Sequence, residues 1–182
     1  GRLGLDLDLA LPEAVLLEMR HALSLDRSVK LVDTGIGLVV VEAERCGGHV
    51  VVFDVPYPPN YGGVVDVFYK LKALQNEGIQ LTLHCFEYGR GKQKELETIC
   101  NQVYYYKRKT GLLGLQWNKP YIVSSRRSSS LLNNLLQDDA PILFEGIHTT
   151  YYLNHPQLQH RFKVLRAHNI EHLYYKNLQC WR

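Results

Sequence analysis

The residues best suited to chemistry form the segment Asp54-Val-Pro-Tyr-Pro-Pro-Asn-Tyr-Gly-Gly63, between an apolar strand pattern and an amphipathic helix pattern. A strand that ends in a Pro-rich bend and a glycine pair, and then opens into a helix, lets a phosphate or a sugar approach the backbone closely. The sequence therefore predicts a binding loop at Gly62 and Gly63. The structural alternative is that these glycines only allow a tight turn into the helix.

Two further segments place polar side chains directly after strand patterns. They are Glu145-Gly-Ile-His148 and Arg166-Ala-His-Asn-Ile-Glu-His172. A functional group at the end of a strand can face a ligand, and we expect His168 to be the main candidate for chemistry. Structural roles compete here too, because His168 could cap the following helix and Glu145 could pair with a nearby basic residue.

Alternating strand and helix patterns must position these segments. Strand patterns cover residues 49–54, 79–86, 102–106, 141–145 and 162–168, and helix patterns cover residues 63–76, 92–101, 128–137, 149–158 and a segment from about residue 170. Apolar residues recur at helical spacing in the first helix, whereas the strands are nearly continuous runs of Val, Ile, Leu, Phe or Tyr. We therefore expect an α/β protein with a doubly wound, Rossmann-like parallel sheet, whose ligands bind beyond the carboxyl ends of the strands.

A different pattern precedes a seam near Arg45-Cys-Gly-Gly48 and predicts an extra N-terminal α+β segment over residues 1–48, ahead of a main domain over residues 49–182. It comprises an alternating strand at 3–9, a helix at 12–23 and a Val/Ile-rich strand pair at about 29–44. Its role is open: a small βαββ unit, an addition to the sheet or a fused segment all fit. Asp33-Thr-Gly35 has the pattern of an aspartic protease half-site, but such an enzyme needs two carboxylates. A turn between two strands is the simpler interpretation.

Composition narrows the classes of function. The 182 residues are 46% hydrophobic and carry a formal net charge of +3, which is typical of a globular protein and too small to indicate nucleic-acid binding. No apolar run is long enough to span a bilayer and no signal-peptide pattern begins the chain, so we expect a cytoplasmic protein. Cysteines at positions 46, 85, 100 and 180 form no CxxC pair and the histidines lack metal-ligand spacing. We therefore expect reduced thiols, no metal and no cofactor.

Residues from about 49 to 178 resemble the N-terminal domain of bacterial retaining glycosyltransferases with the GT-B architecture, of the family-four-like group that includes capsular and exopolysaccharide enzymes. Four features carry the resemblance in order: Pro56-Tyr-Pro-Pro-Asn-Tyr-Gly-Gly63, Leu71-Lys-Ala-Leu74 followed by Glu77-Gly-Ile79, Pro141-Ile-Leu-Phe-Glu-Gly-Ile-His148, and Arg166-Ala-His-Asn-Ile-Glu-His-Leu-Tyr-Tyr175. The resemblance implies the acceptor-side half of a hexosyltransferase that moves a sugar from a nucleotide-sugar to a polysaccharide or lipid-linked glycan acceptor.

The same resemblance implies roles for particular residues. Gly62 and Gly63 would approach the donor diphosphate, His168 would be the catalytic residue, and sugar or acceptor contacts would come from Asn169, Glu171, Glu145, His148 and Tyr61. A complete enzyme of this family continues into a nucleotide-sugar domain, so we expect little transfer by this chain alone. The alternative is a non-catalytic Rossmann-like binding or interaction module.

The resemblance also suggests partners. Basic clusters at Lys107-Arg-Lys109 and Arg126-Arg127 could help to dock an anionic membrane or a lipid-diphosphate acceptor, with the protein held peripherally at the inner face of the plasma membrane. Dimerisation through the face that would meet a second domain is a further expectation.

Overall fold

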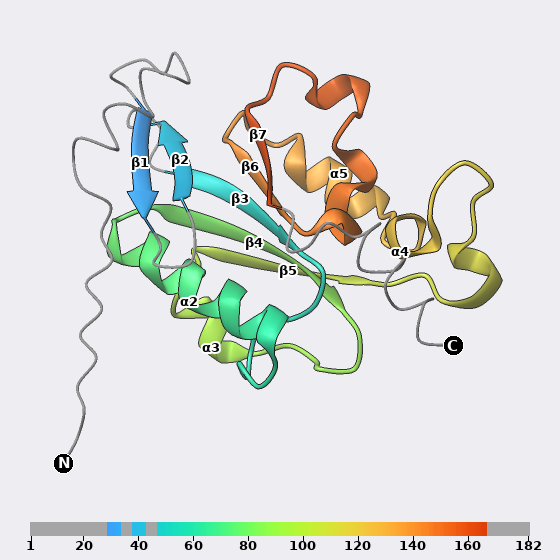
Figure 1. The fold of residues 1–182 in the computed structure, drawn as a ribbon, viewed down its shortest axis with the longest axis horizontal. Coiled ribbons are helices and arrows are strands. Elements are labelled where there is room, and N and C mark those ends of the chain that lie inside the picture. The colour runs from blue at the N-terminus through green and yellow to red at the C-terminus, as the bar shows by residue number, and fades with distance from the viewer. Residues whose placement is uncertain (1–28, 34–37, 43–46, 167–182) are drawn as a thin grey trace, which may run out of the picture.

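Five parallel strands form the central sheet of the protein (Figure 1). The computed structural model describes residues 29–33, 38–42 and 47–166. The sheet order is β5-β4-β3-β6-β7, with bounds of Gly47–Val52 for β3, Gln80–Glu87 for β4, Gln102–Lys107 for β5, Ile142–Glu145 for β6 and Lys163–Arg166 for β7. The expected Rossmann-like α/β fold is confirmed.

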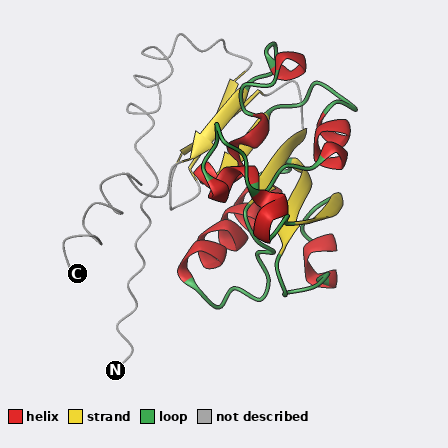
Figure 2. Cartoon of the chain, turned by 90° about the vertical axis from the view of Figure 1, so that its right-hand side faces the viewer, coloured by secondary structure: helices red, strands yellow, loops and turns green. Residues whose placement is uncertain are grey.

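Alternate residues along each strand face two separate apolar cores, as expected for strands that are buried on both sides. On one face Val50, Leu83 and Leu143 pack with helices α2 (Gly62–Asn76) and α3 (Lys94–Glu97). On the opposite face the core belongs to α5 (Ser129–Leu135) and the 3-10 helices η2 (Ile147–Tyr152) and η3 (Pro156–Leu158), which pack on strand residues such as Val51, Phe86 and Phe144. Figure 2 shows helices on both sides of the strands.

Two expected helices are shorter than the sequence pattern predicts. The helix expected at 92–101 is reduced to α3, because Thr98 Oγ1 hydrogen-bonds the Glu95 carbonyl (2.7 Å) and Asn101 is already bound to Leu81 of β4 through both its backbone N–H and its side chain. The helix expected at 149–158 is wrong. Pro156 disfavours helical backbone at the preceding His155, and two 3-10 helices form instead.

The connection between β5 and α5 holds elements that the sequence analysis treated only as a basic loop. It contains the 3-10 helix η1 (Gly111–Gly114) and the short helix α4 (Tyr121–Ser124). Figure 1 shows this connection extending past the carboxyl end of β5, away from the body of the sheet. It therefore lies at the end of the sheet where Rossmann-like proteins bind ligands.

The expected N-terminal strand pair is present as β1 (Val29–Asp33) and β2 (Leu38–Glu42), an antiparallel two-stranded sheet in which Asp33 pairs with Leu38. Thr34 and Gly35 of the Asp33-Thr-Gly35 motif lie outside the described residues, so the turn interpretation stays a prediction. The strand and helix expected at 3–9 and 12–23, and the helix expected from residue 170, lie outside the described residues.

Candidate functional site

The carboxyl end of β3 lies at the point where the sheet changes its direction of growth. From β3 the chain adds β4 and β5 on one side and then crosses to add β6 and β7 on the other. In open parallel sheets the loops at such a switch point diverge and leave a crevice in which ligands bind. The predicted binding loop, residues 54–63, follows this end of β3, and its last two residues begin α2.

Hydrogen bonds of Asp54 connect the start of this loop to its end. The Asp54 carboxylate accepts a hydrogen bond from the Val55 N–H (2.8 Å) and a second from the Tyr61 hydroxyl (2.7 Å). Tyr61 is the N-cap residue of α2 and remains 44% exposed. Burial, followed by the hydrogen bond to Asp54, raises the pKa of the Tyr61 phenol. The phenol therefore stays protonated and presents an exposed aromatic face beside the helix N-terminus.

The two glycines of the loop have different surroundings. A Cβ atom at Gly63 would lie 2.8 Å from Cζ of Phe53, so that ring already fills the space beside Gly63, whereas a Cβ at Gly62 would meet nothing within 4 Å. Both residues occupy the first turn of α2, where backbone N–H groups have no partner within the helix. Gly63 thus serves packing, and Gly62 is the more open of the two predicted anion-binding positions.

His148 lies near the same loop. It belongs to η2, which follows β6, and its ring centroid is 5.4 Å from that of Phe53. Phe53 therefore separates Gly63 from His148 and contacts both. The structure brings two of the three predicted segments together in this way, while His168, Asn169 and Glu171 lie outside the described residues.

Three arginines lie at this end of the sheet, and two of them, Arg90 and Arg126, donate hydrogen bonds to carbonyl groups near the loop. Arg90, which follows β4, donates to the carbonyls of Tyr57 and Pro58 and to Asn60 Oδ1, and its guanidinium lies 5.4 Å from the Tyr61 ring. Arg126 donates to the Phe53 carbonyl at 3.3 Å and is 6% exposed. Arg90 thus attaches the loop to the segment that follows β4, and Arg126 attaches it to the residues that follow α4.

The third arginine, Arg108, follows β5 and stacks on two tyrosines, at 5.3 Å from the Tyr88 ring and 5.6 Å from the Tyr121 ring. Burial, followed by the charge of Arg108, lowers the pKa of Arg126 to about 10. The positive charges of Arg108 and Arg126 at this edge of the sheet attract anions. Together with the α2 N-terminus, they make this edge of the sheet suited to phosphate groups.

Glu145 ends β6 and is fully buried in a cluster of four charged side chains. Its Oε1 accepts a hydrogen bond from Lys70 Nζ at 2.5 Å, and Arg166 contacts its Oε2 at 3.5 Å. Arg166 also binds both carboxylate oxygens of Asp66, which lies one turn before Lys70 on α2. The carboxylate thus contacts cations of the protein itself, as its structural interpretation requires; its role in acceptor binding stays a prediction.

Comparison with known proteins gives one distant relationship. The chain is 33% identical over 138 residues to an uncharacterized 44.6 kDa protein in the cps region of Klebsiella pneumoniae. The match covers 71% of this chain but 35% of the relative, so the chain spans about a third of the protein that it matches. No family model matches the chain, and no solved structure matches it significantly.

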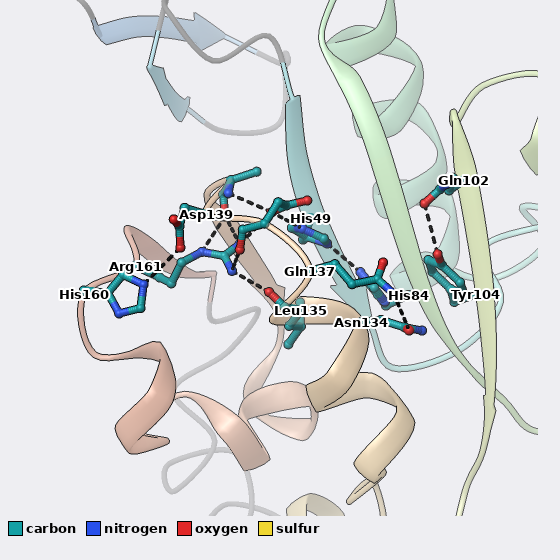
Figure 3. A network of polar contacts seen from close by, with 12 residues as sticks. His49, His84, Gln102, Tyr104, Asn134, Leu135, Gln137, Asp139, His160 and Arg161 are labelled. Carbon is teal, nitrogen blue, oxygen red and sulfur yellow. Dashed lines mark hydrogen bonds and ion pairs between the residues drawn. The ribbon is translucent and has the colours of Figure 1, made fainter.

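A second polar cluster lies inside the protein, on the α5 face of the sheet (Figure 3). His49 Nε2 is 2.9 Å from Asp138 Oδ1, and His49 Nδ1 is 2.8 Å from His84 Nε2. His84 Nδ1 in turn lies 2.8 Å from the Tyr106 hydroxyl, which accepts from Asn134 Nδ2 at 2.8 Å. We call these five residues the histidine chain.

The two ends of the histidine chain, Asp138 and Asn134, determine which atoms along it donate hydrogen bonds. Burial lowers the pKa of His49, and it lowers the pKa of His84 to about 3 with help from the neighbouring His49, so both rings are neutral at pH 7. A carboxylate only accepts, so His49 must carry its proton on Nε2 and His84 must donate from Nε2. Burial raises the pKa of Asp138, but the hydrogen bonds from His49 and the Ala140 N–H, together with the charge of Arg161, outweigh burial and lower the net pKa. Every group in the chain then has a partner, which is how a buried polar cluster becomes tolerable.

Two kinds of feature, a cluster of metal-binding side chains and a long apolar helix, were not found in the described part of the chain. It contains no group of three or more His, Cys, Asp or Glu that could hold a metal ion. No helix within residues 47–166 is long and apolar enough to cross a bilayer. Cys85 and Cys100 are free, buried thiols, and burial raises the pKa of each, whereas Cys46 and Cys180 lie outside the described residues. A small apolar cavity of about 40 Å³ lies at the opposite, amino end of the strands, where Gly47 and Pro141 line it.

Sequence reasoning missed several of these residues. Arg90 follows β4 within three residues, so the search at strand ends that found Glu145 and His148 would have found it too, whereas Arg108 was noted only as part of a basic cluster. His49 and His84 were masked by the runs of Val and Leu around them. The pattern that could have revealed them is one polar residue in each of two adjacent apolar strands, both on the same face of the sheet.

Proposed function

We propose that this chain is the acceptor-side domain of a glycosyltransferase that moves a sugar from a nucleotide-sugar to a polysaccharide or lipid-linked glycan. The observation that carries the proposal is the convergence of the β3 loop, the N-terminus of α2 and three arginines at the carboxyl edge of a Rossmann-like sheet. The relative's name, which refers to a cps region, supports a role in capsular polysaccharide biosynthesis.

The chemistry of the edge fits a diphosphate group. Departure of a nucleoside diphosphate concentrates negative charge on its phosphate oxygens, and backbone N–H groups with a helix dipole stabilise such charge without reorganisation. In the proposal the N–H groups at Gly62 and Gly63 meet the diphosphate. Arg108, which donates to Ser125 Oγ and stacks on Tyr88 and Tyr121, adds a positive charge, while Arg126 is held by carbonyls and acts mainly through its field.

The proposal assigns the sugar side to residues that flank this position. Tyr61 offers a half-exposed ring on which a sugar face can stack, and His148 lies across Phe53 from the loop. His168, with Asn169 and Glu171 beside it in the sequence, remains the proposed catalytic residue. Glu145, which is buried, would act on the acceptor only through the residues that it positions.

Replacing Gly62 by proline tests the diphosphate contact. Proline is favoured at the first position of a helix and removes only an N–H that has no helical partner. The preceding Tyr61 has φ −147° and ψ 159°, which is the extended backbone that a residue before proline adopts. The fold should therefore tolerate Gly62→Pro.

The measurement is calorimetric or NMR titration of the chain with UDP, GDP and their sugar conjugates. Gly62→Ala is the matched control, because it adds a Cβ at the same place and keeps the N–H. Weaker nucleotide binding in Gly62→Pro than in Gly62→Ala supports the proposal. Equal affinities in the two variants would remove the backbone contact, and wild-type protein that binds no nucleotide would favour the non-catalytic binding module.

A further inference from the structure

Four large apolar side chains are exposed together in the connection between β5 and α4. Leu112 is 86% exposed, Leu113 74%, Leu115 55% and Trp117 fully. They lie within six residues, in and just after η1, and Figure 1 shows this segment projecting from the end of the protein. We call residues 109–119 the apolar loop. Single exposed apolar residues are ordinary, but a contiguous group of this kind marks an interaction surface.

The backbone of the apolar loop is held by hydrogen bonds to α4 and the residues after it. The Gly114 carbonyl accepts from Ser124 Oγ at 2.6 Å, and the Leu113 carbonyl accepts from Arg127 at 3.2 Å. Lys109 N–H donates to the Ser125 carbonyl at 2.8 Å. Gly114 is buried, and a Cβ there would lie 2.5 Å from the Lys109 carbonyl oxygen. The leucines therefore project from an ordered turn whose folding does not require them to be buried.

The charge around the apolar loop has a single sign. Residues 98–137 contain no Asp or Glu and carry six cations, Lys107, Arg108, Lys109, Lys119, Arg126 and Arg127. The net charge of the whole chain is only +3, so positive charge is concentrated here. An ordinary protein interface would be expected to mix charges around its apolar centre, whereas an anionic bilayer attracts cations of one sign around inserted apolar residues.

We propose that the apolar loop docks this protein on an anionic lipid bilayer. Trp117 and the three leucines enter the headgroup and upper acyl region, the exposed Lys107 and Lys109 contact the anionic headgroups, and the less exposed cations add to the positive potential. Tryptophan favours this interfacial depth, because its ring is apolar and its N–H remains near water. The apolar loop lies at the carboxyl end of the sheet, so docking turns the edge with Arg108 toward the membrane surface.

Fluorescence of Trp117 provides a direct test on the full chain. The protein has two tryptophans, and Trp181→Phe leaves Trp117 as the only one. With vesicles that contain phosphatidylglycerol, we expect a blue shift of its emission and quenching by lipids brominated on their acyl chains. Vesicles of phosphatidylcholine alone should bind much more weakly, and added salt should weaken binding to the anionic ones.

Two sets of variants separate the apolar contribution from the charge. Leu112→Ser/Leu113→Ser should abolish co-sedimentation with anionic vesicles, whereas the control Tyr69→Ser/Leu136→Ser changes two exposed apolar residues elsewhere and should bind like wild type. Lys107→Gln/Lys109→Gln should weaken binding roughly tenfold or more, because each cation near an anionic surface contributes to affinity. Lys92→Gln/Lys94→Gln removes the same charge from exposed positions around α3 and should have little effect.

Because all of these residues are exposed, their thermal midpoints should match wild type, so a loss of binding can be read directly. The proposal is overturned if Trp117 emission does not respond to anionic vesicles, or if the leucine double variant still binds them. Lipid-free association that depends on Leu112 and Leu113, without vesicle binding, would show instead that the apolar loop meets protein.

Discussion

Lys70 and Glu145 form a buried ion pair with 2.5 Å between Nζ and Oε1, although 75 positions separate them in the sequence. Both side chains are almost completely buried, at 2% and 0% exposure. The pair ties α2 to the carboxyl end of β6 across the top of β3. Removing one partner of such a pair leaves a charge without full compensation, while removing both does not.

A double-mutant cycle measures this coupling. We expect Lys70→Met to lower the free energy of unfolding by about 3–5 kcal/mol, since the buried Glu145 then loses its 2.5 Å ion pair, and its contact to Arg166 is longer, at 3.5 Å. Lys70→Met/Glu145→Leu should recover most of that loss, because Arg166 still has Asp66 and the pair is replaced by apolar volume. Urea unfolding checks both values; additive losses in the double variant would contradict the prediction.

The glycine pair gives a second prediction, on stability. Gly63→Ala should lower the free energy of unfolding by about 1 kcal/mol or more, because the Phe53 ring must move away and partly lose its contact with His148. Gly62→Ala should leave stability unchanged or raise it slightly, since its Cβ enters open space in a helix. Thermal unfolding of the two variants side by side decides; equal effects would mean that Phe53 does not restrain Gly63.

Acid should destabilise the protein through the histidine chain. An unfolded histidine titrates near pH 6.5, but burial lowers the pKa of His84 to about 3 in the folded chain. Between these values the unfolded chain binds a proton that the folded chain excludes. The contribution of neutral His84 to stability is therefore fully present above about pH 6.5. As the pH is lowered from there, the free energy of unfolding falls by roughly 1.4 kcal/mol per pH unit for one such group.

Urea unfolding at several pH values between 7.5 and 4.5 measures this slope. His84→Gln is the matched variant, since an amide can still hydrogen-bond but does not titrate there. It should be less stable than wild type at pH 7.5 yet lose less stability on acidification. A wild-type protein whose stability is flat from pH 7 to pH 5 would refute the protonation argument.

Arg108 should govern affinity for nucleoside diphosphates if the carboxyl edge binds them. Arg108→Gln removes a cation that stacks on Tyr88 and Tyr121 and is half-buried, so we expect UDP or GDP to bind roughly tenfold more weakly. Lys94→Gln, on the exposed surface of α3, is the charge-matched control and should bind like wild type. Calorimetry gives both constants, and identical affinities would place the phosphates elsewhere.

The sequence predicts the sheet well because its strands are buried on both faces and read as apolar runs. Helix lengths were less predictable, since Asn101 and Pro156 end or divide helices through contacts and backbone limits that periodicity does not record. The loop after β3 was identified from its glycines, yet the packing role of Gly63 depends on Phe53, ten positions earlier.

The candidate site was only partly predictable for a related reason. Its strand-end residues can be found from the order of elements, whereas the arginines at this edge come from two different connections, one after β4 and one between β5 and α5, and only the fold brings them to the same edge. Glu145 illustrates the limit. Its position after a strand suggested a ligand contact, and only the fold reveals Lys70 and Arg166 against it.

Helix α2 connects the loop with β7, the strand at the far edge of the sheet, as one rigid element. Asp66 lies four residues, or about 6 Å along the axis, from Gly62, and it grips the guanidinium of Arg166 at the end of β7. A ligand that shifted the first turn of α2 would therefore also act on Arg166 through Asp66. By thermodynamic reciprocity, whatever holds Arg166 in place also tightens or loosens the grip of the loop on its ligand.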